Sequence, residues 1–226
     1  MLTATAATRP DGVDRDGTPD SWRREIRVMV VDDHTAVRLG VAQLLEGQDD
    51  FAVQLVCVGA EDAVSQTAVP DIDIAVIDYH LGGRNGLWLC RRLKQMPEPP
   101  GVIIYSAFAN DHLAACCAVA GADGMLNKAG LGSELCDAVR SVAEGRRSLP
   151  QVPHVVLDML RRRLSDTEQQ LFGMLTAGIP RAEITDRLGM SARELDFREA
   201  AMLRKLEVTP GAASAPSRDD GEHLIP

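Results

Sequence analysis

Aromatic side chains are scarce in this chain of 226 residues, at 4%, whereas hydrophobic residues make up 45%. A core built from this sequence must be mostly aliphatic, and there is enough apolar material for one large or two small domains. No apolar run approaches the length of a transmembrane helix, and the N-terminus lacks the apolar core of a secretion signal. We therefore expect a cytoplasmic protein that has no membrane partner.

Basic residues are also in the minority, since the net charge is −9 and the isoelectric point is about 5.0. This balance argues against a protein that coats nucleic acid through bulk charge, although it leaves room for a small basic site. The cysteines are odd in number, show no C-x-x-C spacing and each lie in an apolar segment, so we expect reduced, buried thiols. They are Cys57, Cys90, Cys116, Cys117 and Cys136.

Five short apolar runs alternate with helical patterns over residues 26–145. The expected strands are 26–31, 51–58, 72–78, 102–106 and 124–127. The helical patterns that follow them cover 37–45, 60–69, 87–96, 113–120 and 131–143. Strands that alternate with helices in this way predict an α/β fold, a five-stranded doubly wound parallel sheet with helices on both faces.

The third of these strands carries the most informative residue. Its apolar run is too short for a core helix and rich in β-branched side chains, which indicates a strand buried on both faces. Asp78 ends the run, and a cluster of three glycines and an asparagine follows at 82–86. A carboxylate at the end of a central parallel strand lies where such sheets bind ligands. Taken alone, Asp78 is explained equally well as a helix cap or a turn residue.

Polar side chains follow four of the five strands, and right-handed crossovers bring these strand ends to one edge. Asp32 and Asp33 follow the first strand, Ser106 ends the fourth, and Lys128 follows the fifth. Each has an ordinary explanation alone, as a cap, a turn residue or a solvated lysine. Together with Asp78 they supply three carboxylates that favour Mg²⁺, and a hydroxyl and an ammonium group that suit a phosphoryl group. The central carboxylate is then the nucleophile for an aspartyl phosphate.

These motifs resemble the receiver domain of bacterial two-component response regulators over about residues 26–145. The resemblance rests on Val31-Asp-Asp-His34, on Asp78 with Gly86 after its loop, on Ser106-Ala107, and on Gly121-Ala-Asp-Gly-Met-Leu-Asn-Lys128. It implies a flavodoxin-like fold in which Asp78 accepts a phosphoryl group from the phosphohistidine of a sensor histidine kinase. It also implies that Mg²⁺ is held by Asp32, Asp33, Asp78 and the backbone carbonyl of His80, that Ser106 hydrogen-bonds the phosphoryl group, and that Lys128 pairs with it.

Three positions in this region distinguish the chain. Met125 stands where the family usually has an aromatic ring whose rotation couples to the phosphorylated state, and Gly82 stands where proline is common. His80 occupies the place where enzymes of the haloacid-dehalogenase type need a second carboxylate, two residues after the nucleophile. We therefore expect a signalling protein and not an enzyme.

The second half of the chain turns to helical patterns without strands. Capping boxes at Ser165–Glu168 and Ser191–Glu194 begin two helices, and Pro180 begins one between them. A turn at Leu188–Ser191 joins two short helices, which predicts a helix-turn-helix. The expected organisation is a disordered leader (1–25), a receiver domain (26–145), a linker with a helix over 155–160 (146–163), an all-α four-helix domain (164–209) and a disordered tail (210–226).

Residues 164–208 resemble the DNA-binding domain of the LuxR/NarL (FixJ-like) group. The resemblance rests on Leu164-Ser165, Glu168, Leu175, Gly178, Glu183-Ile184, Leu188-Gly-Met-Ser191, Leu195 and Leu203-Arg-Lys-Leu-Glu-Val208. The group commonly has Thr-Val-Lys-x-His on its recognition helix, where this chain has Glu194-Leu-Asp-Phe-Arg198. Residues 164–209 hold six basic and eight acidic side chains, a balance of −2 that is unusual for a surface meeting phosphates.

The sequence of the recognition helix does not decide whether this helix binds DNA. Glu194 fits a capping box and an i,i+4 pair with Arg198, but the sequence suggests no structural role for Asp196 or Glu199. The arginines predicted as DNA contacts are Arg181, Arg193 and Arg198.

The prediction as a whole is a homodimeric response regulator, phosphorylated by a histidine kinase with Mg²⁺, that regulates transcription at promoter DNA. The alternative is a signalling adaptor whose degenerate helix-turn-helix contacts proteins.

Overall fold

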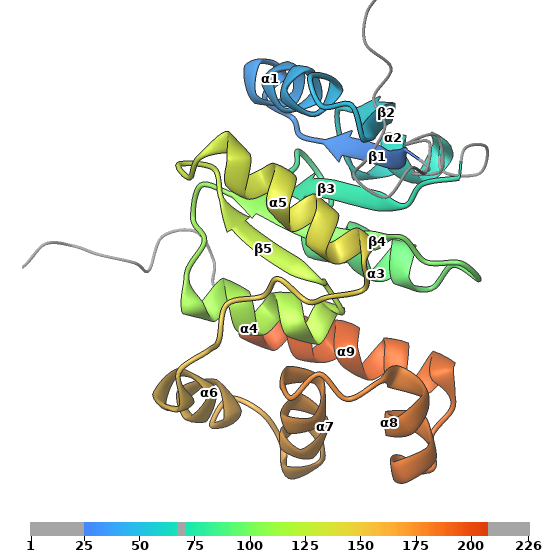
Figure 1. Cartoon of the computed structure of the whole chain (residues 1–226). Helices are drawn as coiled ribbons and strands as arrows, with labels where there is room; N and C mark the ends of the chain where they lie inside the picture. The colour runs from blue at the N-terminus through green and yellow to red at the C-terminus, as the bar shows by residue number, and fades with distance from the viewer. Residues whose placement is uncertain (1–24, 67–70, 208–226) are drawn as a thin grey trace, which may run out of the picture. The chain divides into compact units, whose positions relative to one another are not determined.

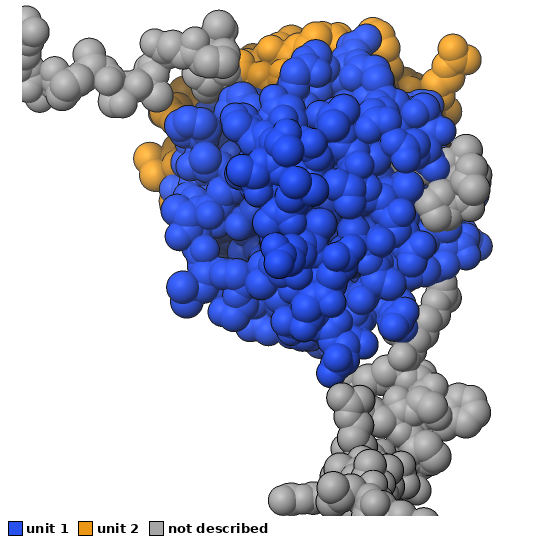
Figure 2. Space-filling model, turned by 90° about the horizontal axis from the view of Figure 1, so that it is seen from above, with its two compact units in different colours: residues 1–152 blue, residues 153–226 orange. Residues whose placement is uncertain are grey.

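A computed structural model of the chain describes residues 25–66 and 71–207 (Figure 1). The chain divides into two compact units, Met1–Val152 and Pro153–Pro226 (Figure 2). This division falls inside the segment 146–163 that was predicted as a linker. The expected disordered leader, up to residue 24, and the expected disordered tail, 210–226, lie outside the described residues.

The described part of the first unit holds five strands and five helices in strict alternation. The strands are β1 Ile26–Val31, β2 Phe51–Cys57, β3 Ile74–Asp78, β4 Gly101–Ser106 and β5 Gly124–Asn127. The helices are α1 Thr35–Glu46, α2 Ala60–Gln66, α3 Gly86–Lys94, α4 Asp111–Ala120 and α5 Gly132–Ala143. All strand pairs are parallel, in the order β2-β1-β3-β4-β5, which confirms the predicted doubly wound sheet.

The central strands are apolar because helices cover the sheet on both faces. Every residue of β3 is buried, and so are the last four residues of β1. Helices α1 and α5 pack on one face, whereas α2, α3 and α4 follow one another across the other (Figure 1). Eight of the ten residues of α4 are buried, which agrees with its lack of charged residues after the first turn.

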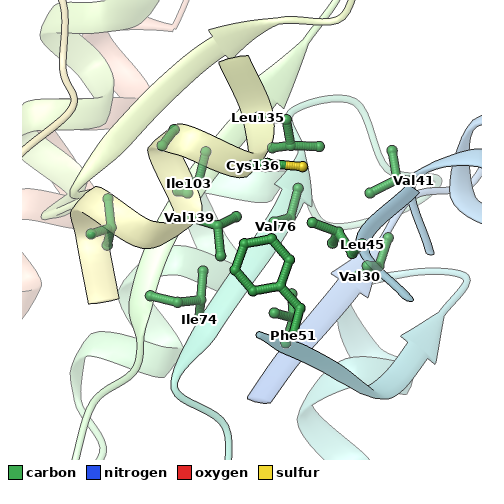
Figure 3. Packing of buried hydrophobic residues seen from close by; sticks show 13 residues of the cluster. Val30, Val41, Leu45, Phe51, Ile74, Val76, Ile103, Leu135, Cys136 and Val139 are labelled. Carbon is green, nitrogen blue, oxygen red and sulfur yellow. The ribbon is translucent and has the colours of Figure 1, made fainter. Parts of the chain in front are cut away.

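The core between the sheet and α1 and α5 is aliphatic, as the composition predicts, and surrounds one aromatic ring. Figure 3 shows the ring of Phe51 among side chains from α1, α5 and the central strands. Those labelled are Val30, Val41, Leu45, Ile74, Val76, Ile103, Leu135, Cys136 and Val139. Each fully buried aliphatic side chain contributes about 1.5–3 kcal/mol, so this cluster makes a large contribution to the stability of the first unit.

Local contacts explain two of the element boundaries that differ from the sequence prediction. β3 begins at Ile74 and not at Ile72, because the Asp73 carboxylate accepts hydrogen bonds from the backbone and guanidinium of Arg27. α3 ends at Lys94 because the next two backbone N–H groups bond three residues back, a tightened turn before Pro97. The predicted end of α2, at residue 69, lies outside the described residues.

The described part of the second unit is helical. Its helices are α6 His154–Arg161, α7 Asp166–Thr176, α8 Arg181–Leu188 and α9 Ala192–Leu206. Gly189 adopts a left-handed conformation (φ 62°) between α8 and α9, a backbone geometry that glycine accepts without strain. Ser191 caps α9 by accepting a hydrogen bond from the Glu194 N–H at 3.1 Å. In the part of the chain that the structure describes, no helix is long and apolar enough to span a membrane.

Glu168 links the start of α7 to the end of α9. We expect this contact to weaken in acid. Its carboxylate accepts a hydrogen bond from the Ser165 backbone N–H at 2.8 Å and lies 2.6 Å from Lys205 Nζ. Lys205 is the main reason that the pKa of Glu168 is lowered, with the Ser165 hydrogen bonds adding to it. Ionised Glu168 therefore stabilises the fold above the unfolded pKa, and this stabilisation is lost as pH falls through the lowered folded pKa.

Glu168→Gln is expected to lower the melting temperature at about pH 7 and to have a smaller effect at about pH 3, below the ordinary glutamate pKa of ~4.3. Thermal melts by circular dichroism on the full chain measure this difference. Glu183→Gln is the control, because the i,i+4 ion pair of Glu183 with Arg187 is exposed to solvent. An equal effect of Glu168→Gln at both pH values would contradict the electrostatic explanation.

Candidate functional site

The parallel sheet brings four strand ends to one edge. Asp32 directly follows β1, Asp78 ends β3, Ser106 ends β4 and Lys128 directly follows β5. The register aligns Asp78 with Tyr105, one residue before Ser106. The structure therefore places the predicted strand-end residues at one edge of the sheet, for the reason that parallel topology gives.

Lys128 links the two buried carboxylates of this edge. Its Nζ lies 2.7 Å from Asp32 Oδ2 and 3.0 Å from Asp78 Oδ2. Both aspartate side chains are only 4% exposed, and the lysine side chain is 14% exposed. Two carboxylates this close and this buried repel each other, and the ammonium group that contacts both offsets this repulsion.

The pKa shifts follow from burial and from this contact. Burial raises the pKa of Asp78, and the hydrogen bond from Lys128 opposes that rise without cancelling it. The charge of Asp32 raises the pKa of Asp78 further, and a hydrogen bond from the His80 backbone lowers it. Burial alone would lower the pKa of Lys128, but its hydrogen bonds to Asp32 and Asp78 outweigh burial and raise it. Lys128 therefore stays protonated beside the carboxylates.

A second group of ligand atoms extends the site toward solvent. One ligand atom each from Asp32, Asp33, His34 and Asp78 lie within 4.8 Å of one another. The His34 backbone N–H donates to Asp32 Oδ1 at 2.8 Å, and its ring Nδ1 lies 2.7 Å from Asp33 Oδ1. Three carboxylates offer the oxygen ligands that Mg²⁺ prefers, so these residues fit that cation. The position of the His80 carbonyl as a ligand stays a prediction.

Ser106 is fully buried beside this cluster. Its Oγ accepts a hydrogen bond from the Phe108 backbone N–H at 3.1 Å, and its carbonyl accepts one from the Lys128 backbone N–H at 2.9 Å. The Phe108 ring makes an edge contact with the His80 ring, at 5.5 Å between centroids. Loop residues after β3 and β4 thus contact each other next to the two strand ends.

Gly86 explains how α3 begins so close to the site. A Cβ atom built on Gly86 would lie 2.2 Å from the backbone carbonyl oxygen of Asp78. The Gly86 N–H donates to the Tyr79 carbonyl at 2.9 Å, which closes the loop that the sequence predicted after Asp78. Any larger residue would push α3 away from the strand end.

In the second unit, the three predicted DNA contacts lie in different surroundings. Arg181, at the start of α8, binds both Asp196 and Glu199 of α9. Arg198 donates to Glu194 at 2.7 Å, one turn earlier on the same helix. Arg193 is exposed and makes no ion pair within residues 25–66 and 71–207. All three predictions remain open, but the structure gives Arg181 an internal role.

Glu199 is the most unusual side chain of this unit, because it is charged and fully buried. Burial alone would lower the pKa of its partner Arg181, but the bonds to Glu199 and Asp196 outweigh burial and raise it. The sequence suggested no structural role for Asp196 or Glu199, and the structure supplies one. Both carboxylates hold the arginine that joins α8 to α9.

Comparisons with known proteins agree with this geometry. A family model described as the response regulator receiver domain matches residues 28–140. The transcriptional regulatory protein UhpA of Salmonella typhimurium is 30% identical over 199 residues, which cover 87% of this chain and 99% of that protein. The chain belongs to the response regulator family.

Two further relatives show how far this family likeness extends. The DNA-binding transcriptional activator DevR/DosR of Mycobacterium tuberculosis is 29% identical over 192 residues, covering 80% of this chain and 88% of that one. A LuxR-family two-component response regulator from Aurantimonas sp. has a solved structure that is 28% identical, covers 62% of this chain and 99% of its own, and gives a TM-score of 0.53.

This response regulator also contains site residues that the sequence interpretation left out. His34 joins the ligand cluster, and the Arg38 guanidinium donates to the Asp32 carbonyl at 2.7 Å. The position of His34 directly after two aspartates was a usable signal. Arg38 lies one helical turn further along α1. Its contact with Asp32 depends on the direction in which that helix runs, which the sequence pattern does not give. Met125, where the family usually has an aromatic ring, is 5% exposed on β5.

Proposed function

We propose that this response regulator accepts a phosphoryl group on Asp78 from a sensor histidine kinase and regulates transcription through α8 and α9 at promoter DNA. The observation that carries the first half is the pairing of one lysine with two buried carboxylates at the edge of a parallel sheet. The family supports the same conclusion, since the chain matches the receiver model over residues 28–140.

The residues of the site have distinct tasks in this transfer. The Asp78 carboxylate attacks the phosphorus atom, and the bond to the kinase imidazole breaks. Lys128 exchanges one of its carboxylate contacts for a phosphoryl oxygen, which keeps its positive charge paired. The Ser106 hydroxyl donates a hydrogen bond to another phosphoryl oxygen. The phosphoryl group remains on the chain, so we propose no turnover of an external substrate.

Mg²⁺ is the cofactor that the carboxylates fit. We assign its ligands to Asp32, Asp33 and Asp78, with the backbone carbonyl of His80. When bound, the cation neutralises charge that develops on the transferred oxygens. The protein orients the carboxylates for this purpose through the His34 N–H and the Lys128 ammonium group.

Removing Lys128 is expected to make the first unit depend on Mg²⁺. Lys128→Met leaves Asp32 and Asp78 buried and unpaired, which costs about 3 kcal/mol of unfolding free energy. Mg²⁺ recovers much of that loss, because it binds the same carboxylates in the folded state only. Urea unfolding followed by Trp88 fluorescence measures this with and without Mg²⁺.

Lys94→Met is the matched control. The Lys94 side chain is also 14% exposed and pairs with an aspartate, Asp123, that is not part of the acidic cluster. Its loss is expected to destabilise the unit equally in both conditions. Equal recovery of both variants by Mg²⁺ would show that the cation does not bind at Asp32 and Asp78.

The second unit is proposed to bind promoter DNA as part of a homodimer. Its support is the turn at Gly189 between α8 and α9, together with relatives described as transcriptional regulators. The domain boundaries that we propose remain those of the sequence, with a receiver at 26–145, a linker at 146–163 and a helix-turn-helix domain at 164–209. We propose that the protein is cytoplasmic, because its two proposed partners, a sensor kinase and promoter DNA, are both accessible from that compartment.

The alternative function is a signalling adaptor whose helix-turn-helix contacts proteins. One observation favours it, namely the excess of acidic over basic residues in 164–209. Both functions share the receiver chemistry, so only a test of duplex binding separates them.

Gel shifts of the full chain on pooled genomic fragments at low salt provide that test, with and without Mg²⁺ and beryllofluoride. We expect retarded fragments for the wild type and at least tenfold weaker binding for Arg193→Glu, which places a carboxylate against phosphates. Arg92→Glu, on α3 of the receiver, changes the net charge equally and should bind as the wild type does. No retarded fragment in any condition would favour the adaptor.

A further inference from the structure

The outer face of α9 carries an apolar side chain between two arginines. With 3.6 residues per turn, Arg193, Phe197, Ala200 and Arg204 share one side of the helix. Phe197 is 70% exposed, and both arginines are exposed as well. The opposite side holds the buried residues Leu195, Glu199, Met202, Leu203 and Leu206. The exposed face is therefore separate from the face that packs in the unit.

Ion pairing makes this outer face positive although the domain as a whole is acidic. Glu194 is engaged by Arg198, and Asp196 and Glu199 are engaged by Arg181. Within the described residues, Arg193 and Arg204 have no carboxylate partner. The outer face of α9 thus presents two cations and one aromatic ring, which is complementary to an anionic partner that also offers an apolar group.

Duplex DNA offers this combination in its major groove. The one apolar group on the base edges there is the C5-methyl group of thymine, which phenylalanine can contact. The two arginines are eleven positions apart, or about 16 Å along the helix, so they can reach phosphates on both sides of a groove about 12 Å wide. Ala200 adds no long side chain beside the ring. A second copy of this face fits less well, since it would bring four arginines together.

We infer that Phe197 is a specificity-determining residue that reads a thymine methyl group, while Arg193 and Arg204 bind the flanking phosphates. This inference rests on the proposed DNA-binding function and adds a base preference to it. It also explains why α9 keeps a large apolar side chain in solvent, where it contributes nothing to the core.

The test begins with selection of duplexes from a random library by the full wild-type chain, in Mg²⁺ and beryllofluoride at low salt. Single thymines in the selected site are then replaced by deoxyuridine, which removes the methyl group and keeps the hydrogen-bonding edge. We expect about fourfold weaker binding at one thymine per half-site, which corresponds to the ~0.8 kcal/mol of one buried methyl group.

Phe197→Ala is expected to bind the selected duplex more weakly and to lose the distinction between thymine and deoxyuridine, while Phe197→Leu keeps part of it. Val155→Ala, which removes an equally exposed apolar side chain on α6, should retain the full distinction. Circular dichroism confirms that each variant is folded. Arg204→Gln should weaken all duplexes alike and reduce the salt dependence by about one ion.

The inference would be overturned by any of the following results. Duplex binding with no methyl-sensitive thymine, or with the same sensitivity in Phe197→Ala, would leave the proposed function intact and remove the role of Phe197. A DNA-free dimer that Phe197→Ala disrupts would assign the face to a second copy. Absence of any selected duplex would remove the DNA-binding function itself, and the inference with it.

Discussion

Asparagine in place of Asp78 is expected to abolish phosphoryl acceptance, whereas the wild-type chain is expected to gain a phosphoryl group from acetyl phosphate when Mg²⁺ is present. The amide of asparagine has no anionic oxygen to attack phosphorus, although it has almost the same shape as the carboxylate. Intact-protein mass spectrometry measures the gain in mass directly. The expected effect is a complete loss, since Asp78 is the carboxylate that we propose as the nucleophile, whereas Asp32, the other carboxylate bonded to Lys128, is proposed to bind Mg²⁺.

Asp137→Asn is the matched control for this experiment. Asp137 lies on α5, its side chain is 78% exposed, and it pairs with Arg140 of the same helix. This variant should accept a phosphoryl group as the wild type does. Phosphorylation of the Asp78→Asn protein, or no mass gain in the wild type with Mg²⁺, would contradict the assignment of Asp78.

The sheet edge could be predicted from the sequence because parallel topology fixes it. Once the alternation of strands and helices is recognised, every strand must end at the same edge, and the residues after β1, β3, β4 and β5 must meet there. The pairing of Lys128 with Asp32 and Asp78 follows from that rule and from charge. The ends of the elements were less predictable, since β3 begins two residues late through the side chain of Asp73.

The link between α8 and α9 could not be predicted in the same way. Arg181 and Glu199 are 18 positions apart, and their contact depends on how two helices cross after the turn at Gly189. No periodicity in the sequence encodes a crossing of that kind. The net charge of the domain therefore argues against DNA binding, although two of the α9 carboxylates, Asp196 and Glu199, pair with Arg181 inside the unit.

This internal pairing changes the meaning of the acidic composition. A domain with a net charge of −2 can still offer a positive surface if its carboxylates face its own arginines. Glu199 and Asp196 lie toward Arg181, while Arg193 lies on the outer side of α9. The sum of charges therefore describes the domain poorly, and the distribution of charge decides what α9 can contact.

The buried pair leads to the second large effect. Arg181→Met leaves Glu199 fully buried without its cation, and breaking a buried pair from one side costs about 3–5 kcal/mol. We expect the lower end of that range, because the Arg181 side chain is 32% exposed and water relieves part of the cost. Hydrogen exchange of backbone amides in α8 and α9, followed by mass spectrometry, measures the loss, since both tryptophans lie outside residues 153–226.

The double variant Arg181→Met/Glu199→Leu separates an ionic role from a packing role. Removing both charges replaces the pair with apolar contacts of similar size, so its stability should return to within about 1 kcal/mol of the wild type. Glu199→Leu alone leaves Arg181 bonded to Asp196 and should cost little. If the double variant is as unstable as Arg181→Met, the arginine acts through its packing, and the carboxylates of α9 have no share in joining the two helices. If instead the double variant is stable but binds the selected duplex more weakly, then the ion pair fixes the angle at which α9 is presented, and the acidic residues of this helix serve DNA binding indirectly.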